Sequence, residues 1–498
     1  MATLQEQALE KLKAAGLSDV LYLPGQEAYN DRVTSQWSQT AQLKPWAIVQ
    51  PRKTEEVSKA VKVIVDVPDL KFALRRLSGL TSLSIAELVG DANMVASGGH
   101  MQWAGASSIE DGITIDLGLM ASTTYNAETE VASLQPGGSW AVSYRELEKH
   151  GRMVASGREG KVGIAGLLTG GGKTFYTCRV GWGCDQVINY EVVLANGRIV
   201  NANNTDNVDF FRALKGGGNN FGIVTRFDIL TFPAKDIWNA SRTILKDHTA
   251  QVSSAFIDFT KNVTAAPDDH ILAMWVYTPK AEEHFIVLDL MNLNGVENPD
   301  TLGAFLSIPA QGEDYTASVA TKLERLIVPT SGHHTWFTLT FKADVRIILK
   351  AAQAFEVLIE TVKIQVPDHH FSSQMVLQPL AASFAERSLA RGGNMLGLER
   401  IKDDCVILVC SLETQTAELN ETVGRPALKI GIDEIEDFAK SVDDDVDFRY
   451  LNYCDGSHCP IARYGDENVQ KMREVAARVD PQGVFQKRVP GGFKIPQP

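Results

Sequence analysis

Glycine is unevenly distributed along this chain of 498 residues, and the distribution restricts the folds it can adopt. Residues 157–172 read GREGKVGIAGLLTGGG, and further glycine clusters stand at 97–100 (SGGH) and 215–218 (KGGG). Because glycine lacks a Cβ, such loops let backbone N–H groups come close to an anionic or crowded ligand. Glycine becomes sparse between about 236 and 445. The sequence therefore predicts a ligand-binding, loop-rich part followed by a middle part of different construction.

The N-terminal part has the pattern of alternating strands and helices. An amphipathic helix is predicted from Thr54, its expected N-cap, to residue 65, because apolar residues recur there at i, i+3, i+4 and i+7. Short strands are predicted before it in PWAIVQP, and after it at 70–74 and 113–117. This order indicates α/β layering.

A hairpin is predicted around Asn196-Gly197, which separates YEVVLA from RIVNA and is typical of a type I′ turn. The middle part instead alternates strand-like runs, such as 271–279 and 405–412, with helical runs, such as 348–363. We expect an α+β architecture with a largely antiparallel sheet there.

Eight segments in order carry a resemblance to a known family. They are PWAIVQPRKTEEVSKAVKVI, KFALR, SGGHMQWAGAS, GGSWAVSYRELEKHGRMVASG, VGIAGLLTGGG, GWGCDQVINYEVVLANGRIV, NVDFFRALKGGGNNFGIVTRFDI, and YLNYCD with the helix that follows it. In this order they resemble the FAD-linked oxidoreductases of the berberine-bridge-enzyme type, within the vanillyl-alcohol-oxidase superfamily. The segments cover the N-terminal half and the last fifty residues.

The resemblance implies an α+β fold with a PCMH-type FAD-binding domain that is split in the sequence. Residues 1–235 and a returning C-terminal segment, 446–498, would form it. Residues 236–445 would be an inserted substrate-binding domain, an antiparallel sheet covered by helices.

The resemblance also implies which residues contact the FAD. The glycine loops would hold the pyrophosphate through backbone N–H groups. The matching positions are Ser97, Gly98, Gly99, His100, Val162, Gly163, Gly166, Thr169, Gly170, Gly171, Gly222, Ile223 and Asn452.

His100 matches the family histidine that is bonded covalently to the flavin 8α-methyl group. Many relatives carry a second bond from a cysteine, but the matching stretch here, residues 157–163, contains none. We therefore expect a single covalent bond, through His100. The alternative is that His100 merely packs in a turn.

Tyr450, Asn452 and Tyr453 match the family segment that contacts the flavin, in which the second tyrosine accepts a proton. Read as a strand, the segment places Tyr450 and Asn452 on one face and Tyr453 on the other. A tyrosine base requires a lowered pKa, because the phenol is ordinarily neutral at pH 7. The catalytic candidates are therefore Tyr453 and Tyr450, with two packing residues as the alternative.

Composition excludes several classes of partner. Lys+Arg 48 against Asp+Glu 61 gives a net charge of −13, which disfavours nucleic acid and anionic membrane surfaces. The N-terminus lacks the pattern of a secretory signal, so a cytoplasmic location is expected, although family members are often secreted. His333-His334 and His369-His370 resemble metal-ligand pairs, but neighbours on a strand point to opposite faces, so no metal site is expected.

Residues 76–96 separate KFALR from SGGHM, which are almost adjacent in relatives. The segment is either a genuine surface excursion or a translated intron, and the second interpretation is favoured because the break falls inside an intact motif. The whole pattern predicts an FAD-dependent oxidase of a small alcohol, sugar or specialised metabolite, with O2 as the acceptor. A dehydrogenase with another acceptor and a flavin-binding protein without turnover are the alternatives.

Overall fold

The computed structural model describes residues 3–75, 99–155, 157–325 and 332–498. The inserted segment proposed at 76–96, together with Ser97 and Gly98, lies outside the described residues. Within the described ranges the strands form a four-stranded, a five-stranded and a seven-stranded sheet, and one further strand pair.

The four-stranded sheet holds the N-terminal α/β layer. Its order is β1 (Leu21–Tyr22), β2 (Ala47–Val49), β4 (Ile113–Asp116), β3 (Phe72–Arg75), and β2, β4 and β3 run parallel. The helix α3 (Thr54–Val65) connects β2 to β3, as the sequence predicted, but it is capped by Lys53 and not by Thr54. Thr54 instead donates its hydroxyl to Glu191 in the neighbouring sheet, 2.8 Å away.

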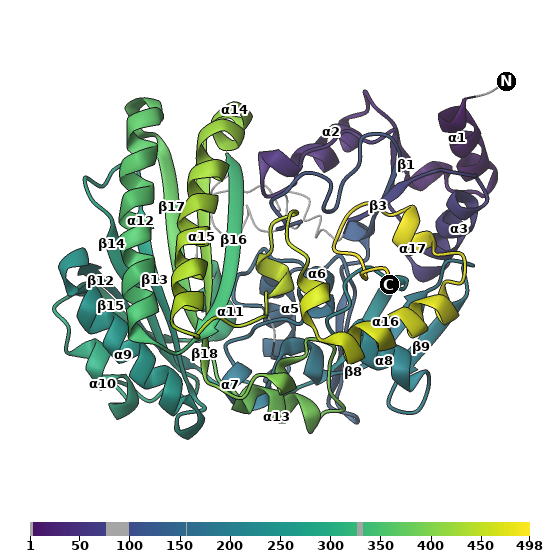
Figure 1. Ribbon diagram of the computed structural model, residues 1–498. Helices are drawn as coiled ribbons and strands as arrows, with labels where there is room; N and C mark the ends of the chain where they lie inside the picture. The colour runs from purple at the N-terminus through teal and green to yellow at the C-terminus, as the bar shows by residue number, and fades with distance from the viewer. Residues whose placement is uncertain (1–2, 76–98, 156, 326–331) are drawn as a thin grey trace.

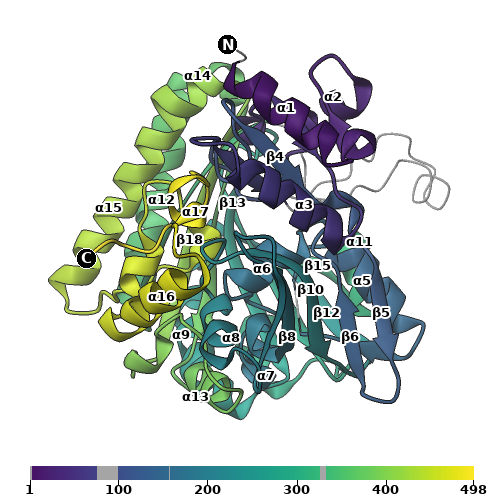
Figure 2. The same cartoon turned by 90° about the vertical axis from the view of Figure 1, so that its right-hand side faces the viewer.

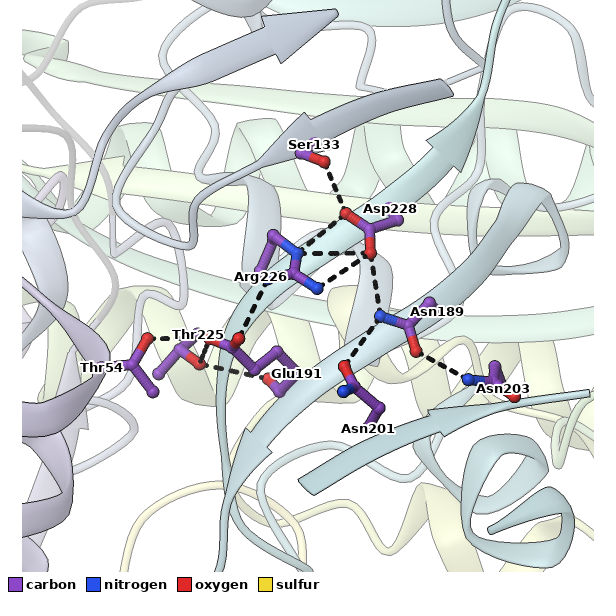
Figure 3. A network of polar contacts seen from close by, with 9 residues as sticks. All are labelled: Thr54, Ser133, Asn189, Glu191, Asn201, Asn203, Thr225, Arg226 and Asp228. Carbon is purple, nitrogen blue, oxygen red and sulfur yellow. Dashed lines mark hydrogen bonds and ion pairs between the residues drawn. The ribbon is translucent and has the colours of Figure 1, made fainter. Parts of the chain in front are cut away.

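The five-stranded sheet is antiparallel. Its order is β5 (Thr123–Asn126), β6 (Val131–Leu134), β10 (Ile223–Leu230), β8 (Val187–Val193), β9 (Ile199–Asn203), and a separate pair joins β7 (Arg152–Met153) to β11 (Phe232–Pro233). A polar network crosses this sheet from α3 to β9 (Figure 3), with Arg226 paired to Glu191 at 2.9 Å and to Asp228 at 2.9 Å. Four strands and one helix are thereby held together by charge-assisted hydrogen bonds.

The predicted hairpin of β8 and β9 is present, but its turn differs from the prediction. Gly197 has a φ of +76°, whereas Asn196 is not among the residues of positive φ, so the turn is not type I′. The Gly197 N–H donates to the Leu194 carbonyl at 2.8 Å, and the Leu194 N–H donates to the Arg198 carbonyl. This is the three-residue loop in which a left-handed glycine follows a type I turn.

The seven-stranded sheet is antiparallel throughout. Its order is β15 (Gln311–Ala317), β12 (Ile237–Leu245), β14 (Phe285–Asn292), β13 (Asp269–Tyr277), β17 (Phe371–Leu380), β18 (Cys405–Thr414), β16 (His333–Lys342). Helices α9 (Thr249–Asn262), α12 (Val345–Gln365) and α15 (Arg425–Ser441) cover its outer face, on the left of Figure 1. The predicted α+β class, with an antiparallel sheet covered by helices, is confirmed.

The remaining helices lie around these sheets. They are α1 (Leu4–Ala14), α2 (Glu27–Thr34), α5 (Trp140–Glu148), α6 (Ile164–Thr169), α7 (Thr177–Val180), α8 (Val208–Leu214), α10 (Gly303–Leu306), α11 (Val319–Arg325), α13 (Ser383–Leu389), α14 (Ala417–Leu419), α16 (Asp466–Val479) and α17 (Val484–Lys487). The view in Figure 2 shows α1 beside α3, and α12 beside α15.

The last fifty residues return to the N-terminal part of the chain, as the yellow ribbon shows (Figure 1). Helix α16 packs on α8, and Asn220 donates to the carbonyl of Phe493 at 2.9 Å. One hydrophobic cluster runs from the five-stranded to the seven-stranded sheet, and a second lies between α3 and the four-stranded sheet and includes Phe485. The domain boundaries at 235 and 445 stay a prediction, which these contacts support.

Arg488 links this returning segment to the end of α3. Its guanidinium donates to the carbonyls of Ile64, Val65, Val67 and Leu70 at 2.5 to 2.9 Å. Ile64 and Val65 are in the last turn of α3 and Val67 and Leu70 follow it, so the guanidinium bonds the carbonyls at the helix C-terminus and opposes the negative end of the helix dipole.

We predict that Arg488→Gln lowers the free energy of unfolding by about 2 kcal/mol, the range for hydrogen bonds to a charged group. Urea unfolding followed by circular dichroism measures this, as a lower midpoint at unchanged slope. Arg145→Gln is the matched control, because Arg145 is about half exposed (47%) and pairs with surface glutamates. Equal midpoints for the two variants would contradict the role given to Arg488.

Candidate active site

A cavity of about 380 Å³ lies between the N-terminal glycine loops and the seven-stranded sheet. Its glycine-loop wall comes from residues 99–107, from 158–163 and from α6; its sheet wall comes from Trp336 on β16 and Gln374 on β17; residues 450–453 close it. The size falls within the range of small-molecule sites, and the lining is mostly apolar with a few converging polar groups, as is typical of them.

His100 lies in the glycine-loop wall and is paired with Glu159. The ring atom Nε2 is 3.2 Å from the Glu159 carboxylate, and the ring stacks on Trp37 at 5.4 Å. Burial opposes the ionisation of Glu159, but the contact with His100 and the backbone N–H groups of Lys161 and Val162 outweigh it, so the pKa of Glu159 is lowered. Atom Nδ1 of His100 is buried without a hydrogen-bond partner among the described residues.

The segment from Tyr450 to Tyr453 is a turn of 3₁₀-helix, η11 (Leu451–Tyr453), so the predicted strand is wrong here. The Tyr453 N–H donates to the Tyr450 carbonyl at 2.9 Å, and the two rings meet edge to face at 4.7 Å. In a 3₁₀-helix residues i and i+3 lie on the same side, which brings both tyrosines together. The period-two interpretation had placed them on opposite faces.

Tyr450 is fully buried and its hydroxyl oxygen is already engaged. It accepts hydrogen bonds from the N–H groups of Gly172 at 3.1 Å and Lys173 at 2.9 Å, and from the amide of Asn452 at 3.0 Å. Burial first, then the neighbouring Tyr453, raises the pKa of Tyr450. This tyrosine therefore holds the glycine loop in place and is poorly suited to accept a proton.

Tyr453 has a different environment, since its hydroxyl contacts a cation and an amide. Arg158 donates to the Tyr453 oxygen at 2.7 Å and to Gln378 on β17 at 2.6 Å, and the Gln378 amide donates to Tyr453 at 3.0 Å. A guanidinium beside a phenol oxygen stabilises negative charge on it. Nearby, burial and then the charge of Arg158 lower the pKa of Lys173 to about 7.

The structure brings most of the predicted site residues to the cavity. Those that line it are Gly99, His100, Val162, Gly163, Gly166, Thr169, Tyr450, Asn452 and Tyr453. Gly170 packs behind Asn452, Gly171 lies next to Leu396, and Gly222 and Ile223 are buried against β8; these four do not line the cavity. Their assignment to the cofactor stays a prediction.

Several lining residues were not predicted. Arg158 and Glu159 belong to the stretch that the sequence analysis used only for its lack of cysteine, and two consecutive opposite charges within a glycine-rich loop were the available signal. Trp336 and Gln374 also line the cavity, and Gln378 bonds to Tyr453 without lining it; all three come from strands without any motif. Their placement depends on the register of the sheet, which local sequence does not reveal.

Comparison with known proteins identifies the family. The sequence model of the FAD binding domain family matches residues 84–203. FAD-dependent monooxygenase drtC of Aspergillus calidoustus is 34% identical over 497 residues, which cover 98% of this chain and 90% of that protein. The structure of a berberine bridge enzyme variant aligns with a TM-score of 0.74 at 15% identity, covering 97% of this chain and 99% of that one. This chain belongs to the family of FAD-dependent oxidoreductases that includes the Aspergillus protein, and it has the fold of berberine bridge enzyme.

The chain is accordingly an FAD-dependent oxidoreductase, as its resemblance to the berberine-bridge-enzyme type implied. A second solved structure with this fold is glucooligosaccharide oxidase from Acremonium strictum, described as carrying a 6-S-cysteinyl, 8α-N1-histidyl FAD. It aligns with a TM-score of 0.73 at 18% identity and covers 99% of this chain and 100% of that one. The predicted FAD cofactor is confirmed for the family.

The cavity residues of this berberine-bridge-type chain fit FAD on two observations. The buried Nδ1 of His100 has no partner among the described residues, as expected of an atom that a ligand engages. A Cβ added at Gly166 would meet no atom within 4 Å, so this glycine of α6 leaves open space at the cavity wall. The cysteines do not line the cavity, and no cluster of three metal-ligating side chains occurs in the described parts. Nor does any helix of those parts have the length and hydropathy to span a bilayer.

We predict that Gly166→Ala separates folding from cofactor retention. Alanine is favoured over glycine in a helix by about 1 kcal/mol and meets no clash here, so the thermal midpoint of the flavin-free protein stays equal or rises. The added methyl group occupies space needed by the FAD, so the flavin content of the purified protein falls. Absorbance at the flavin bands and differential scanning fluorimetry measure the two effects. A lower midpoint with unchanged flavin content would contradict this assignment.

Proposed function

We propose that this protein is an FAD-dependent oxidase of a small organic molecule, with Tyr453 as the base. When bound, FAD supplies an acceptor at N5 for the hydride of a substrate C–H bond, and O2 then takes the two electrons to give hydrogen peroxide. The main support for this proposal is the environment of the two candidate tyrosines. Both line the cavity, but only the Tyr453 hydroxyl is held by side chains and not by backbone N–H groups.

The proton path follows from the Tyr453 contacts. The Tyr453 hydroxyl accepts from Arg158 and from the Gln378 amide and also contacts the Gln378 carbonyl oxygen at 3.2 Å, and in the proposed reaction it takes the substrate proton while Arg158 stays charged. Gln378 and Arg158 also fix the orientation of the hydroxyl, which a base must have before transfer. Tyr450 holds the adjoining loop through the N–H groups of Gly172 and Lys173.

A monooxygenase is the second candidate function, and the name of the Aspergillus relative favours it. In that reaction an oxygen atom of O2 enters the product, whereas an oxidase releases both atoms as peroxide. Turnover under ¹⁸O2, with mass spectrometry of the product and a peroxide assay, separates the two. Substrates of fungal specialised metabolism are the first to test. A bleached flavin that O2 does not reoxidise, but another electron acceptor does, would identify a dehydrogenase.

We predict that Tyr453→Phe lowers kcat by about 100-fold or more, the usual contribution of a positioned base, with little change in flavin content. Tyr450→Phe is the matched variant. It removes the acceptor of three N–H groups, so its main effect is a lower thermal midpoint and weaker flavin retention. Stopped-flow reduction of the flavin by a substrate that bleaches the wild type measures the first effect. A Tyr453→Phe protein that is reduced at the wild-type rate would exclude Tyr453 as the base.

We further propose that His100 carries the single covalent bond to the flavin. The Glu159 carboxylate lies 3.2 Å from Nε2, on the side of the ring away from Nδ1, and the buried Nδ1 has no partner among the described residues, so its lone pair is available for that bond. Wild-type protein then keeps its yellow colour in the pellet after acid precipitation, whereas His100→Ala releases the colour.

Glu159→Gln tests whether the contact between Glu159 and His100 assists covalent attachment, separately from whether His100 forms the bond. We predict that it slows covalent attachment by about 100-fold, because a neutral amide does not stabilise the positive charge that develops on the His100 ring as the bond forms. In-gel flavin fluorescence after adding FAD to flavin-free protein follows the attachment. Glu146→Gln is the control, since Glu146 pairs with Lys149 outside the cavity. Attachment at the wild-type rate in Glu159→Gln would remove Glu159 from the process while leaving His100 in place.

A further inference from the structure

Arg158 has a hydrogen-bonding capacity that the network around Tyr453 does not use. Its Nη2 donates to Tyr453 and Gln378, but its Nη1 is buried and has no acceptor among the described residues. Buried guanidinium N–H groups are normally paired, so an unpaired one in a cavity wall indicates an absent acceptor.

The charged groups around the cavity also indicate that Arg158 lacks an acceptor. Arg158 forms no ion pair with any carboxylate in residues 3–75, 99–155, 157–325 or 332–498. The carboxylate next to it in sequence, Glu159, is engaged by His100 and by backbone N–H groups. The other cation of the wall, Lys173, donates to the carbonyl of Pro379 at 2.6 Å. Arg158 is therefore a cation of the cavity wall that has no carboxylate partner among the described residues.

We propose that Arg158 binds an oxyanion attached to an sp² carbon of the substrate: a carboxylate, phenolate or enolate. This inference rests on the proposed function and adds the substrate class. A guanidinium matches planar oxyanions in geometry and charge. Because Nη2 holds Tyr453, the anion on Nη1 lies beside the base, and its substrate is positioned for proton removal.

The rest of the cavity fits a planar substrate with such a group. Trp37 and Trp336 meet at 5.2 Å in the same wall, and Trp103 also lines the cavity. Aromatic walls favour flat ring systems. Gln374 on β17 lines the cavity and lies four residues before Gln378, on the same face of the strand. A flat, acidic aromatic or enolic compound fits both the Arg158 guanidinium and the tryptophan side chains.

The test compares two probes of equal shape, benzoate and benzamide, by isothermal titration calorimetry of the purified holoprotein. We expect benzoate to bind about tenfold more tightly than benzamide, and Arg158→Gln to remove that preference while benzamide affinity changes by no more than about twofold. A second pair, 4-nitrophenol and nitrobenzene, distinguishes phenolate from carboxylate recognition. Arg158→Lys keeps the charge without the planar fork and should fall between the wild type and Arg158→Gln.

Arg145→Gln is the control for a loss of one positive charge, and it should keep the benzoate preference because Arg145 lies outside the cavity. Equal affinities of the anionic and neutral probes in the wild type, including no binding of either, would overturn the proposal. So would an equal loss of both benzoate and benzamide affinity in Arg158→Gln. Calorimetry does not depend on flavin reduction, so an enzyme that never bleaches would contradict the proposed function and still allow this comparison.

Discussion

The hydroxyl of Tyr450 is the point on which the site depends. It accepts from the backbone of Gly172 and Lys173, which are nearly 280 positions away in the sequence, and from the amide of Asn452. Asn452 in turn donates to the carbonyl of Leu167 at 3.1 Å, at the end of α6. Three N–H groups on one buried oxygen thus join the C-terminal segment to the glycine loop. They fix the position of residues 450–453 relative to α6 and the glycine loop that follows it.

The same contacts explain why two tyrosines three positions apart have different properties. Tyr450 is surrounded by N–H donors and apolar side chains, and its pKa is raised by burial. Tyr453 points to the sheet, where a cation and an amide hold its oxygen. The 3₁₀ turn between them brings the rings into contact at 4.7 Å while sending the hydroxyls to different partners. Proximity in sequence therefore says little about their chemistry.

Particular residues show how much of the fold and of the site could be predicted from the sequence. His100, Gly163 and Gly166 were predicted from the family resemblance, which rests on several glycine-rich motifs in order, and all three line the cavity. The strands of the seven-stranded sheet were predicted in part from their apolar runs, but β12, β15 and β17 were not. Gln378, which bonds to Tyr453, was missed with β17, since its position follows from pairing across the sheet. The period-two prediction at 450–453 was wrong because the Tyr453 N–H bonds within its own turn.

Arg158 and Glu159 show how one dipeptide serves two walls of the cavity. The two side chains diverge from a bend in the loop: one reaches the sheet and the other reaches His100. If both faced the same wall, they would pair with each other and neutralise the cavity. Their divergence instead leaves an acceptor for the histidine ring on one side and a cation beside the tyrosine on the other. The site thus holds a positive and a negative charge, each next to a different partner. The flanking glycines, Gly157 and Gly160, allow this loop to pass close to α5, because a Cβ at either position would lie within 3.0 Å of α5 side chains.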